Sequence, residues 1–261
     1  MEAKIKVLQE MGFNVEKTEL NAEVYTDFCE LLYSYKDIFA TKLSDLAEGS
    51  HVIECPILIN PDAKPVRMRP YGLNDSMRAV VDKQLDELLE AGILKESQGS
   101  QWASPIVLVK KASGDWRFCS DFRYLNSCCR VLHHELPTID DVKDVMSRNQ
   151  AKVLSTMDMK AAYYQLWTSK ETAECSTICT GFRGCYFYTR LPMGMVQSPY
   201  YMCLALNKIF RFQIGTFLLV YLDDIFCCSP PQKFISSIWK LYFRSSGRLI
   251  LNCILRSVIL C

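Results

Sequence analysis

The chain has 261 residues, of which 49% are hydrophobic and 23% charged, and its formal net charge is +1. This composition excludes a disordered, collagenous or coiled-coil protein, and the length predicts about two domains or one large one. Because the net charge is close to zero, any nucleic-acid contact has to come from local clusters of basic residues. No apolar run approaches the roughly 20 residues that cross a bilayer, and the N-terminus lacks the apolar segment of a secretory signal. We therefore expect a cytoplasmic or nuclear protein that is not secreted and has no membrane contact.

The thirteen cysteines are an odd number and contain no C-x-x-C pair. This pattern favours reduced thiols that are buried as small hydrophobic residues. A zinc site at Cys128, Cys129, His133 and His134 is the alternative, but adjacent Cys-Cys and His-His pairs suit tetrahedral coordination poorly.

In the first part of the chain, the apolar spacing predicts an amphipathic helix over residues 21–39. Residues 50–73 are rich in proline and are expected to be extended. A second helix is predicted over residues 74–91, with Asn74 or Asp75 as its cap.

Short strands then follow the helices. Residues 105–110 and 116–121 read as a hairpin around a Ser-Gly-Asp turn. A helix is predicted to start at Pro137, and Asp140 and Asp141 in its first turn are interpreted as structural because negative charge is favourable there.

The remaining elements complete an α+β pattern, which predicts an antiparallel sheet backed by helices on one face. The expected strands are residues 153–158, 163–168, 184–190, 216–222 and 225–228, and a helix is expected from Ser198 to about Phe212.

Two adjacent carboxylates, Asp223 and Asp224, lie between two apolar runs. Two like charges held in a tight turn repel each other unless they share a cation, and oxygen ligands of this kind suit Mg²⁺. Asp158 ends another apolar strand and could complete a two-metal site for phosphoryl transfer. A solvated acidic turn is the alternative interpretation.

Basic residues gather around the predicted hairpin and outnumber the acidic residues there. Such a cluster could neutralise a triphosphate, although a solvated basic face is the alternative. Its members are Lys110, Lys111, Arg117, Arg123 and Arg130.

Five motifs in order resemble the reverse transcriptase region of a gypsy-like LTR retrotransposon Pol polyprotein, with the likeness running from about residue 51 to 230. Tyr221-Leu-Asp-Asp224 matches the family's Y-x-D-D motif. The other four are Ser104 to Lys111, Trp116 to Asn126, Ser155 to Gln165, and Leu191-Pro-Met-Gly194 with the following residues to Pro199.

This resemblance implies a right-hand polymerase fold of fingers and palm. It implies RNA-directed DNA synthesis on a template–primer of RNA or DNA from deoxynucleoside triphosphates, with two Mg²⁺ ions, or Mn²⁺ in their place. It also implies that the chain acts together with the other Pol segments, namely the thumb and ribonuclease H. The implied location is a cytoplasmic virus-like particle or the nucleus.

The resemblance also implies roles for single residues. Asp158, Asp223 and Asp224 would be the catalytic, metal-binding carboxylates, and Met159 would add its backbone carbonyl. Lys111 and Arg117 would bind the triphosphate of the substrate, with Lys110 as the alternative to Lys111. Tyr163 would lie against the sugar, and Met193 and Gly194 would shape the base-pair pocket.

The sequence departs from the family pattern at three places. Ala162 replaces a common glycine, which matters only if its backbone has a positive φ. Trp167 replaces a residue that is commonly polar or aliphatic. The expected domains are an N-terminal helical lead-in over residues 1–50 and the fingers and palm over residues 51–230. Residues 231–261 are expected to be a truncated or degenerate tail that is mobile or aggregated.

Two other functional readings follow from the same residues. The missing thumb supports a catalytically inactive retroelement remnant, with nucleic-acid binding as its remaining role. An unrelated two-metal phosphohydrolase is a third reading, but it does not explain the fingers motifs.

Overall fold

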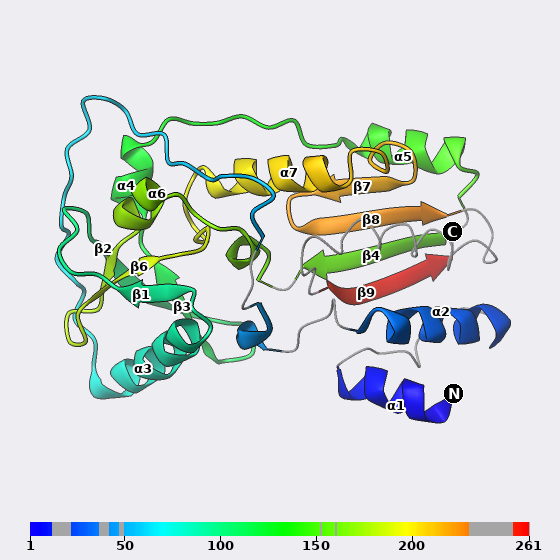
Figure 1. Cartoon of the computed structure of the whole chain (residues 1–261), viewed down its shortest axis with the longest axis horizontal. Helices are drawn as coiled ribbons and strands as arrows, with labels where there is room; N and C mark the ends of the chain where they lie inside the picture. Colours follow the sequence, from blue (N-terminus) through cyan, green and yellow to red (C-terminus); the bar gives the residue numbers. More distant parts are fainter. Residues whose placement is uncertain are drawn as a thin grey trace. The chain divides into compact units, whose positions relative to one another are not determined.

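The fold is that of a computed structural model, which describes residues 1–11, 22–36, 42–46, 50–151, 153–159, 161–229 and 253–260. These residues form two compact units (Figure 1). The first unit comprises Met1–Thr41, His134–Ala162 and Met202–Cys261, and the second comprises Lys42–His133 and Tyr163–Tyr201. Each unit therefore draws on segments that lie far apart in the sequence.

The first unit contains a four-stranded sheet in the order β7-β8-β4-β9. All three strand pairs are antiparallel. The apolar composition of these strands suits burial, and Leu218, Ile225 and Cys228 are almost completely buried. The strands are β4 (Val153–Met159), β7 (Leu218–Tyr221), β8 (Asp224–Ser229) and β9 (Cys253–Leu260).

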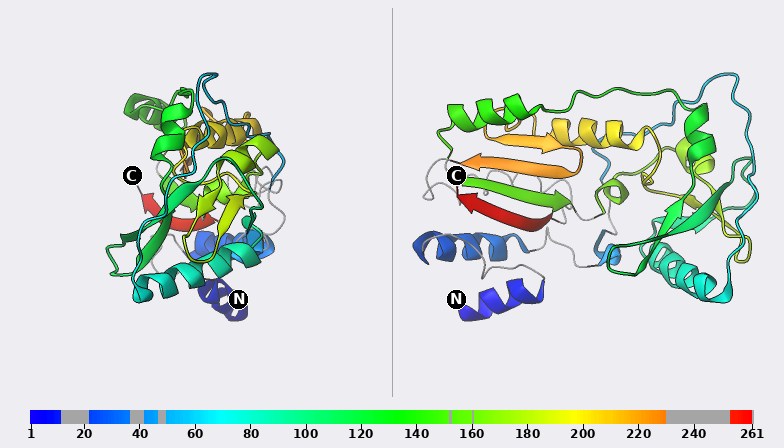
Figure 2. Two further views of the ribbon diagram at one scale, coloured as in Figure 1. Left: turned by 90° about the vertical axis from the view of Figure 1, so that its left-hand side faces the viewer. Right: turned by 180° about the vertical axis from the view of Figure 1, so that it is seen from behind.

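Helix α5 (Ile139–Arg148) packs on this sheet at its β7 side (Figure 2). Its buried Val145 contacts Leu219 and Cys228 in a small apolar cluster. Helices α1 (Glu2–Glu10) and α2 (Ala22–Ser34) contact each other through an ion pair between Lys4 and Glu30. Helix α7 (Ser198–Ile209) contributes its residues from Met202 onward to this unit.

The second unit contains a five-stranded sheet in the order β1-β6-β5-β2-β3. The β2–β5 pair is parallel and the other pairs are antiparallel. Among the described strands, β3 has a neighbour on one side only, which makes it an edge strand. The strands are β1 (Leu94–Glu96), β2 (Ser104–Lys110), β3 (Trp116–Ser120), β5 (Ile178–Cys179) and β6 (Cys185–Tyr188).

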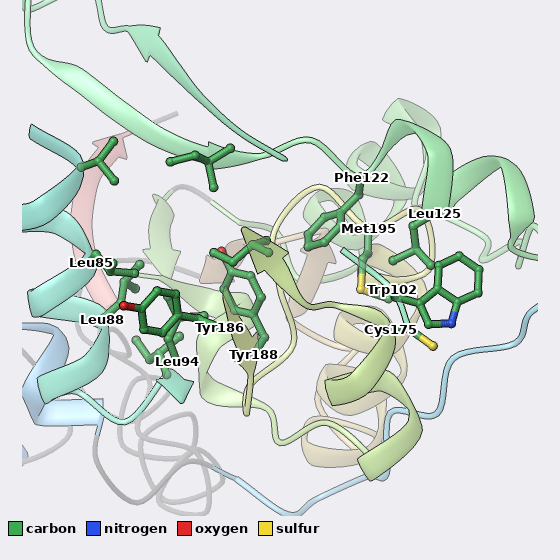
Figure 3. Close-up of a cluster of buried hydrophobic side chains, with 14 of the residues drawn as sticks. Leu85, Leu88, Leu94, Trp102, Phe122, Leu125, Cys175, Tyr186, Tyr188 and Met195 are labelled. Atoms are coloured by element: carbon green, nitrogen blue, oxygen red, sulfur yellow. The ribbon is translucent and has the colours of Figure 1, made fainter. Parts of the chain in front are cut away.

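A single hydrophobic core joins this sheet to its helices (Figure 3). Helix α3 (Asp75–Glu90) buries Val81, Leu85 and Leu88, which recur every three or four residues on one face. Tyr186 and Tyr188 of β6 lie in the same cluster. The unit's short helices are η3 (Leu43–Leu46), α4 (Arg123–Cys128) and α6 (Lys170–Cys175), and η4 (Ala162–Gln165) begins at the boundary between the units.

Most predicted elements are confirmed within one to five residues at their ends. One is wrong: residues 163–168, expected to be a strand, instead contain the end of the 3-10 helix η4 and two isolated bridges. The bridge partners Leu166 and Trp167 contact Ser50 and Arg190, two distant residues. Tyr163, Tyr164 and Trp167 are half-buried in this irregular segment, so the aromatic-rich run does not correspond to a regular strand.

The cysteine prediction is wrong for one pair. Cys179 and Cys185 form a disulfide, with 4.2 Å between their Cα atoms. They lie directly opposite each other in the β5–β6 pair, so their side chains share one face of the sheet. The nine other cysteines whose side chains are described are not in disulfides, and eight of them are buried.

The predicted tail also differs from expectation where it is described. Residues Cys253–Leu260 form β9, which pairs with β4 from end to end apart from a register shift at Arg256. An apolar strand in this place covers the side of β4 that faces away from β8. The rest of the predicted tail, residues 231–252 and 261, lies outside the described residues.

Candidate active site

The β7–β8 hairpin places two carboxylates at one end of the four-stranded sheet. Tyr221 pairs with Asp224, which leaves Leu222 and Asp223 as a two-residue turn. Leu222 adopts a φ of 55°, in the left-handed region where a bulky side chain is unfavourable. Such backbone strain concentrates at functional sites, because the surrounding structure has to maintain it.

The neighbouring strand brings a third acidic residue to the same end. In the β4–β8 register, Asp158 lies directly opposite Asp224. The next residue, Met159, donates its backbone N–H to the carbonyl oxygen of Asp223 at 3.3 Å. The backbones of Asp158, Asp223 and Asp224 therefore meet at one corner of the sheet.

The chemistry of this corner fits divalent cations. Asp223 and Asp224 are half-buried, and adjacent carboxylates in that position are stabilised by a shared cation. Carboxylate oxygens and a backbone carbonyl, such as that of Met159, are the ligands that Mg²⁺ prefers. Among the side chains that the structure describes, no group of three His, Cys, Asp or Glu residues forms a metal site. The side chain of Asp158 is not among these described side chains. Within the described part of the chain, Cys128, Cys129, His133 and His134 do not gather as a metal site.

The basic hairpin belongs to the second unit. Lys110 pairs with Trp116, and Val109 pairs with Arg117. Side chains alternate between the faces of a strand, and the Lys111 N–H continues the ladder by donating to the Asp115 carbonyl at 2.7 Å. Lys111 and Arg117 therefore lie on the same face, whereas Lys110 lies on the face whose Phe118 packs against the core. All three cations are exposed.

The turn at Met193 and Gly194 is held by two side chains of the same unit. Asn126 donates from its Nδ2 to the Gly194 carbonyl at 2.8 Å and accepts from the Val196 N–H at 2.8 Å. Ser198 donates from its Oγ to the Pro192 carbonyl at 2.7 Å. Gly194 has a φ of 90°, a value that glycine tolerates, and Met193 is 40% exposed. Asn126 was not predicted as a site residue, although it ends one of the quoted motifs.

The departures from the family pattern have local explanations. Ala162 does not have a positive φ; the residue before it, Ala161, does, at 50°. Trp167 covers the guanidinium of Arg190, whose Cζ lies 3.8 Å from the ring centroid, and His51 stacks on the same indole at a centroid distance of 5.3 Å. Arg190 is buried, which lowers its pKa, and the aromatic ring stabilises its charge. The predicted sugar contact, Tyr163, is half-buried in η4.

Arg123, which belongs to the predicted cluster of cations, forms an ion pair with Asp121. Its Nη2 lies 2.7 Å from Oδ2 of Asp121, and its Nε donates to Oδ1 at 2.8 Å. Tyr71 donates to Oδ2 of the same carboxylate at 2.9 Å. Arg130, also in that cluster, is exposed, and its backbone N–H donates to the Leu58 carbonyl.

Comparison with solved structures defines the class of fold. The foamy viral protease–reverse transcriptase, solved in complex with double-stranded DNA, matches 95% of this chain with a TM-score of 0.76 at 20% sequence identity. A crystal structure of the prototype foamy virus protein gives a TM-score of 0.77 at 21% identity, also over 95% of this chain. The match covers 43% and 32% of those chains, respectively. The chain therefore has the α+β reverse transcriptase fold.

The sequence itself defines the family. The profile of the family "Reverse transcriptase (RNA-dependent DNA polymerase)" matches residues 109–247, which is more than half of the chain. This chain belongs to the reverse transcriptase family. Its relatives include the Pol polyproteins of the Drosophila melanogaster transposons opus and gypsy, each 29% identical, over 80% and 66% of the chain respectively. The resemblance to gypsy-like retrotransposons is confirmed.

The chain spans only a small part of these relatives. It covers 20% of the opus polyprotein and 17% of the gypsy polyprotein. A Caenorhabditis elegans protein, K02A2.6, is 32% identical over 80% of this chain, which covers 16% of it. Within the described ranges, no helix combines the length and apolar character needed to cross a membrane.

Proposed function

We propose that this chain is the catalytic part of a polymerase that extends a DNA primer on an RNA template. The observation that carries the proposal is the β4–β8 register, which places Asp158 opposite Asp224 beside the Asp223 turn. Three acidic residues from two sequence motifs thus share one corner of a sheet in a chain of reverse transcriptase fold. A structural role would not require three like charges at one strand end.

The carboxylates would hold the metal ions that nucleotidyl transfer requires. Asp158, Asp223 and Asp224 are the proposed ligands, and Met159 would add its carbonyl oxygen. Two bound divalent ions activate the primer hydroxyl and stabilise the charge on the leaving oxygen. Because the tight turn fixes the Asp223 and Asp224 backbones, the two carboxylates do not have to be reorganised when the ions bind.

The second unit would bind the incoming nucleotide. Lys111 and Arg117 share one face of the β2–β3 hairpin, which favours Lys111 over Lys110 as the second cation for the triphosphate. Tyr163 would lie against the sugar and exclude a 2′-hydroxyl by its bulk. Met193 and Gly194 would shape the base-pair pocket, in a turn that Asn126 and Ser198 hold.

The partners and location of the protein are part of the same proposal. Solved relatives were captured with double-stranded DNA and with an RNA/DNA hybrid, which supports a template–primer as the partner of this fold. The other Pol segments of the retrotransposon relatives, including thumb and ribonuclease H, are proposed partners in a polyprotein. A cytoplasmic virus-like particle or the nucleus stays a prediction for its location.

Primer extension tests the proposal. The full chain is incubated with an RNA template, a DNA primer, deoxynucleotides and Mg²⁺ or Mn²⁺, beside Asp223→Asn and Asp224→Asn. We expect extension by the natural chain and a loss of about 100-fold or more in each variant, since each removes a metal-binding charge. Asp140→Asn, which removes an exposed charge of α5 in the same unit, is the matched control and should retain activity.

The assay also separates the two readings of the sequence. A folded natural chain that does not extend the primer with either metal contradicts the proposal and favours a catalytically inactive remnant. Binding of a labelled RNA/DNA hybrid by that same inactive chain would then support the nucleic-acid-binding role.

A further inference from the structure

The edge strand β3 carries Arg117, and no strand of the described residues lies on its outer side. In an antiparallel ladder, alternate residues turn their N–H and C=O groups away from the neighbouring strand. The Lys111–Asp115 hydrogen bond sets this alternation, so Trp116 and Phe118 point these groups outward. Unpaired groups of this kind leave an edge strand free to bend or to pair elsewhere.

The side chain of Gln84 pairs with both outward residues. Its Nε2 donates to the Trp116 carbonyl at 2.9 Å, and its Oε1 accepts from the Phe118 N–H at 2.9 Å. A carboxamide carries a donor and an acceptor like those of a peptide group, so it can replace a neighbouring strand at two points. The two bonds bracket Arg117 and thereby restrain the backbone on both sides of it.

The helix that carries Gln84 is itself well anchored. Helix α3 is capped by Asn74, whose side chain accepts from the Met77 N–H at 2.9 Å. Leu85, the residue after Gln84, is completely buried in the core, and so is Val81, one turn earlier. Gln84 therefore extends from a well-anchored helix, and the two hydrogen bonds of its amide restrain the backbone of β3.

We infer that Gln84 is a positioning residue for Arg117 and orients that guanidinium toward the triphosphate of the incoming nucleotide. This inference rests on the proposed function, because it assumes that Arg117 binds the triphosphate. Phe118 packs against the core, so Arg117 points to the opposite face, where Lys111 also lies. When the backbone at Arg117 is fixed before the nucleotide binds, less conformational entropy is lost as Arg117 contacts the triphosphate.

Nucleotide binding by Gln84 variants of the full chain tests this role. Gln84→Met keeps the length of the side chain and removes both hydrogen bonds. We expect it to raise the KM for deoxynucleotide, and the Kd for magnesium tripolyphosphate in calorimetry, by about fivefold, with a smaller change in kcat. Gln84→Glu retains the acceptor for Phe118 and should give a smaller effect. Lys83→Met, an exposed position on the same helix, is the matched control.

A double-mutant cycle separates positioning from a general loss of stability. In an Arg117→Ala background, Gln84→Met should have no further effect on KM or Kd, because the group that it positions is gone. An equal loss in both backgrounds, or unchanged KM and Kd in both Gln84 variants of an active chain, overturns the inference and leaves the proposed function intact. A natural chain that neither extends primers nor binds tripolyphosphate overturns both.

Discussion

Aspartates within the quoted motifs lie in different surroundings. Asp223 and Asp224 lie half-buried at the β7–β8 turn, where the β4–β8 register places Asp158 opposite Asp224. Asp121, by contrast, has a side chain only 6% exposed and accepts hydrogen bonds from Arg123 and Tyr71. The Arg123 guanidinium, together with Tyr71, holds the pKa of the Asp121 carboxyl well below its usual range. Asp121 is therefore a structural anion.

This environment predicts a pH-dependent contribution to stability. The lowered pKa means that the folded state favours the ionised carboxylate, so Asp121 stabilises the fold above its unfolded pKa of about 3.9. The stabilisation is lost as the pH falls from there toward the lowered value. Asp121→Asn should reduce the free energy of unfolding by about 1–2 kcal/mol at pH 7, and the difference from the natural chain should shrink below pH 4.

Urea unfolding at pH values from 3 to 7 measures this difference. Tyr71→Phe removes one hydrogen bond and leaves the Arg123 contact, so its effect at pH 7 should be smaller than that of Asp121→Asn. A difference between Asp121→Asn and the natural chain that stays constant over the whole pH range would contradict the prediction.

Helix α5 shows how local sequence signals position an element. Thr138 accepts from the Asp141 N–H, and the Asp141 side chain accepts in return from the Thr138 N–H, which completes a capping box. The Thr138 N–H and hydroxyl both donate to Oδ2 of Asp141, and these two hydrogen bonds lower the pKa of that carboxyl. Asp140 pairs with Lys143 at 2.9 Å. The structural interpretation of the acidic pair at 140 and 141 is confirmed.

Removal of the cap predicts a defined loss of stability. Thr138→Ala leaves the Asp141 N–H without its side-chain acceptor, and it should lower the free energy of unfolding by about 1 kcal/mol. Thr138→Ser keeps the hydroxyl and should stay within a few tenths of the natural chain. Denaturant titration followed by circular dichroism measures both, and equal losses in the two variants would show that the hydroxyl contact is unimportant.

The chain as a whole is built from interleaved segments, and its ends contribute to the same unit. Strand β4 comes from the middle of the chain, yet its two neighbours are β8 and β9. Asp158 of β4 faces Asp224 on one side and Ile254 on the other. The strand that carries the first carboxylate is thus supported on both edges.

Deletion of residues 253–261 tests the importance of β9. The shortened chain loses the hydrogen-bonded partner of β4 and exposes an apolar strand edge, so we expect a lower Tm and a larger aggregated fraction. A chain that ends at Leu260 retains β9 and serves as the control. Thermal unfolding and size-exclusion chromatography compare them, and a shortened chain that stays monomeric with an unchanged Tm would show that β9 is dispensable.

Strong periodic patterns were sufficient to predict much of the fold. The apolar face of α3, the β2–β3 hairpin and the start of α5 follow from residue spacing and capping, because each depends on contacts within a few residues. The short elements α4, α6, β1 and β5 were not predicted, since two to six residues carry too little periodicity. The strand predicted over residues 163–168 was wrong because half-buried aromatic side chains also occur in irregular segments such as this one.

Composition, motif order and the Asp158, Asp223 and Asp224 carboxylates were enough to recognise a gypsy-like reverse transcriptase and to name its candidate site. The tertiary structure alone decided which strand faces which. It placed Asp158 opposite Asp224 and brought Gln84 to the outer edge of β3. Those contacts join residues distant in the sequence, and their geometry depends on strand register and helix packing, which no local pattern specifies.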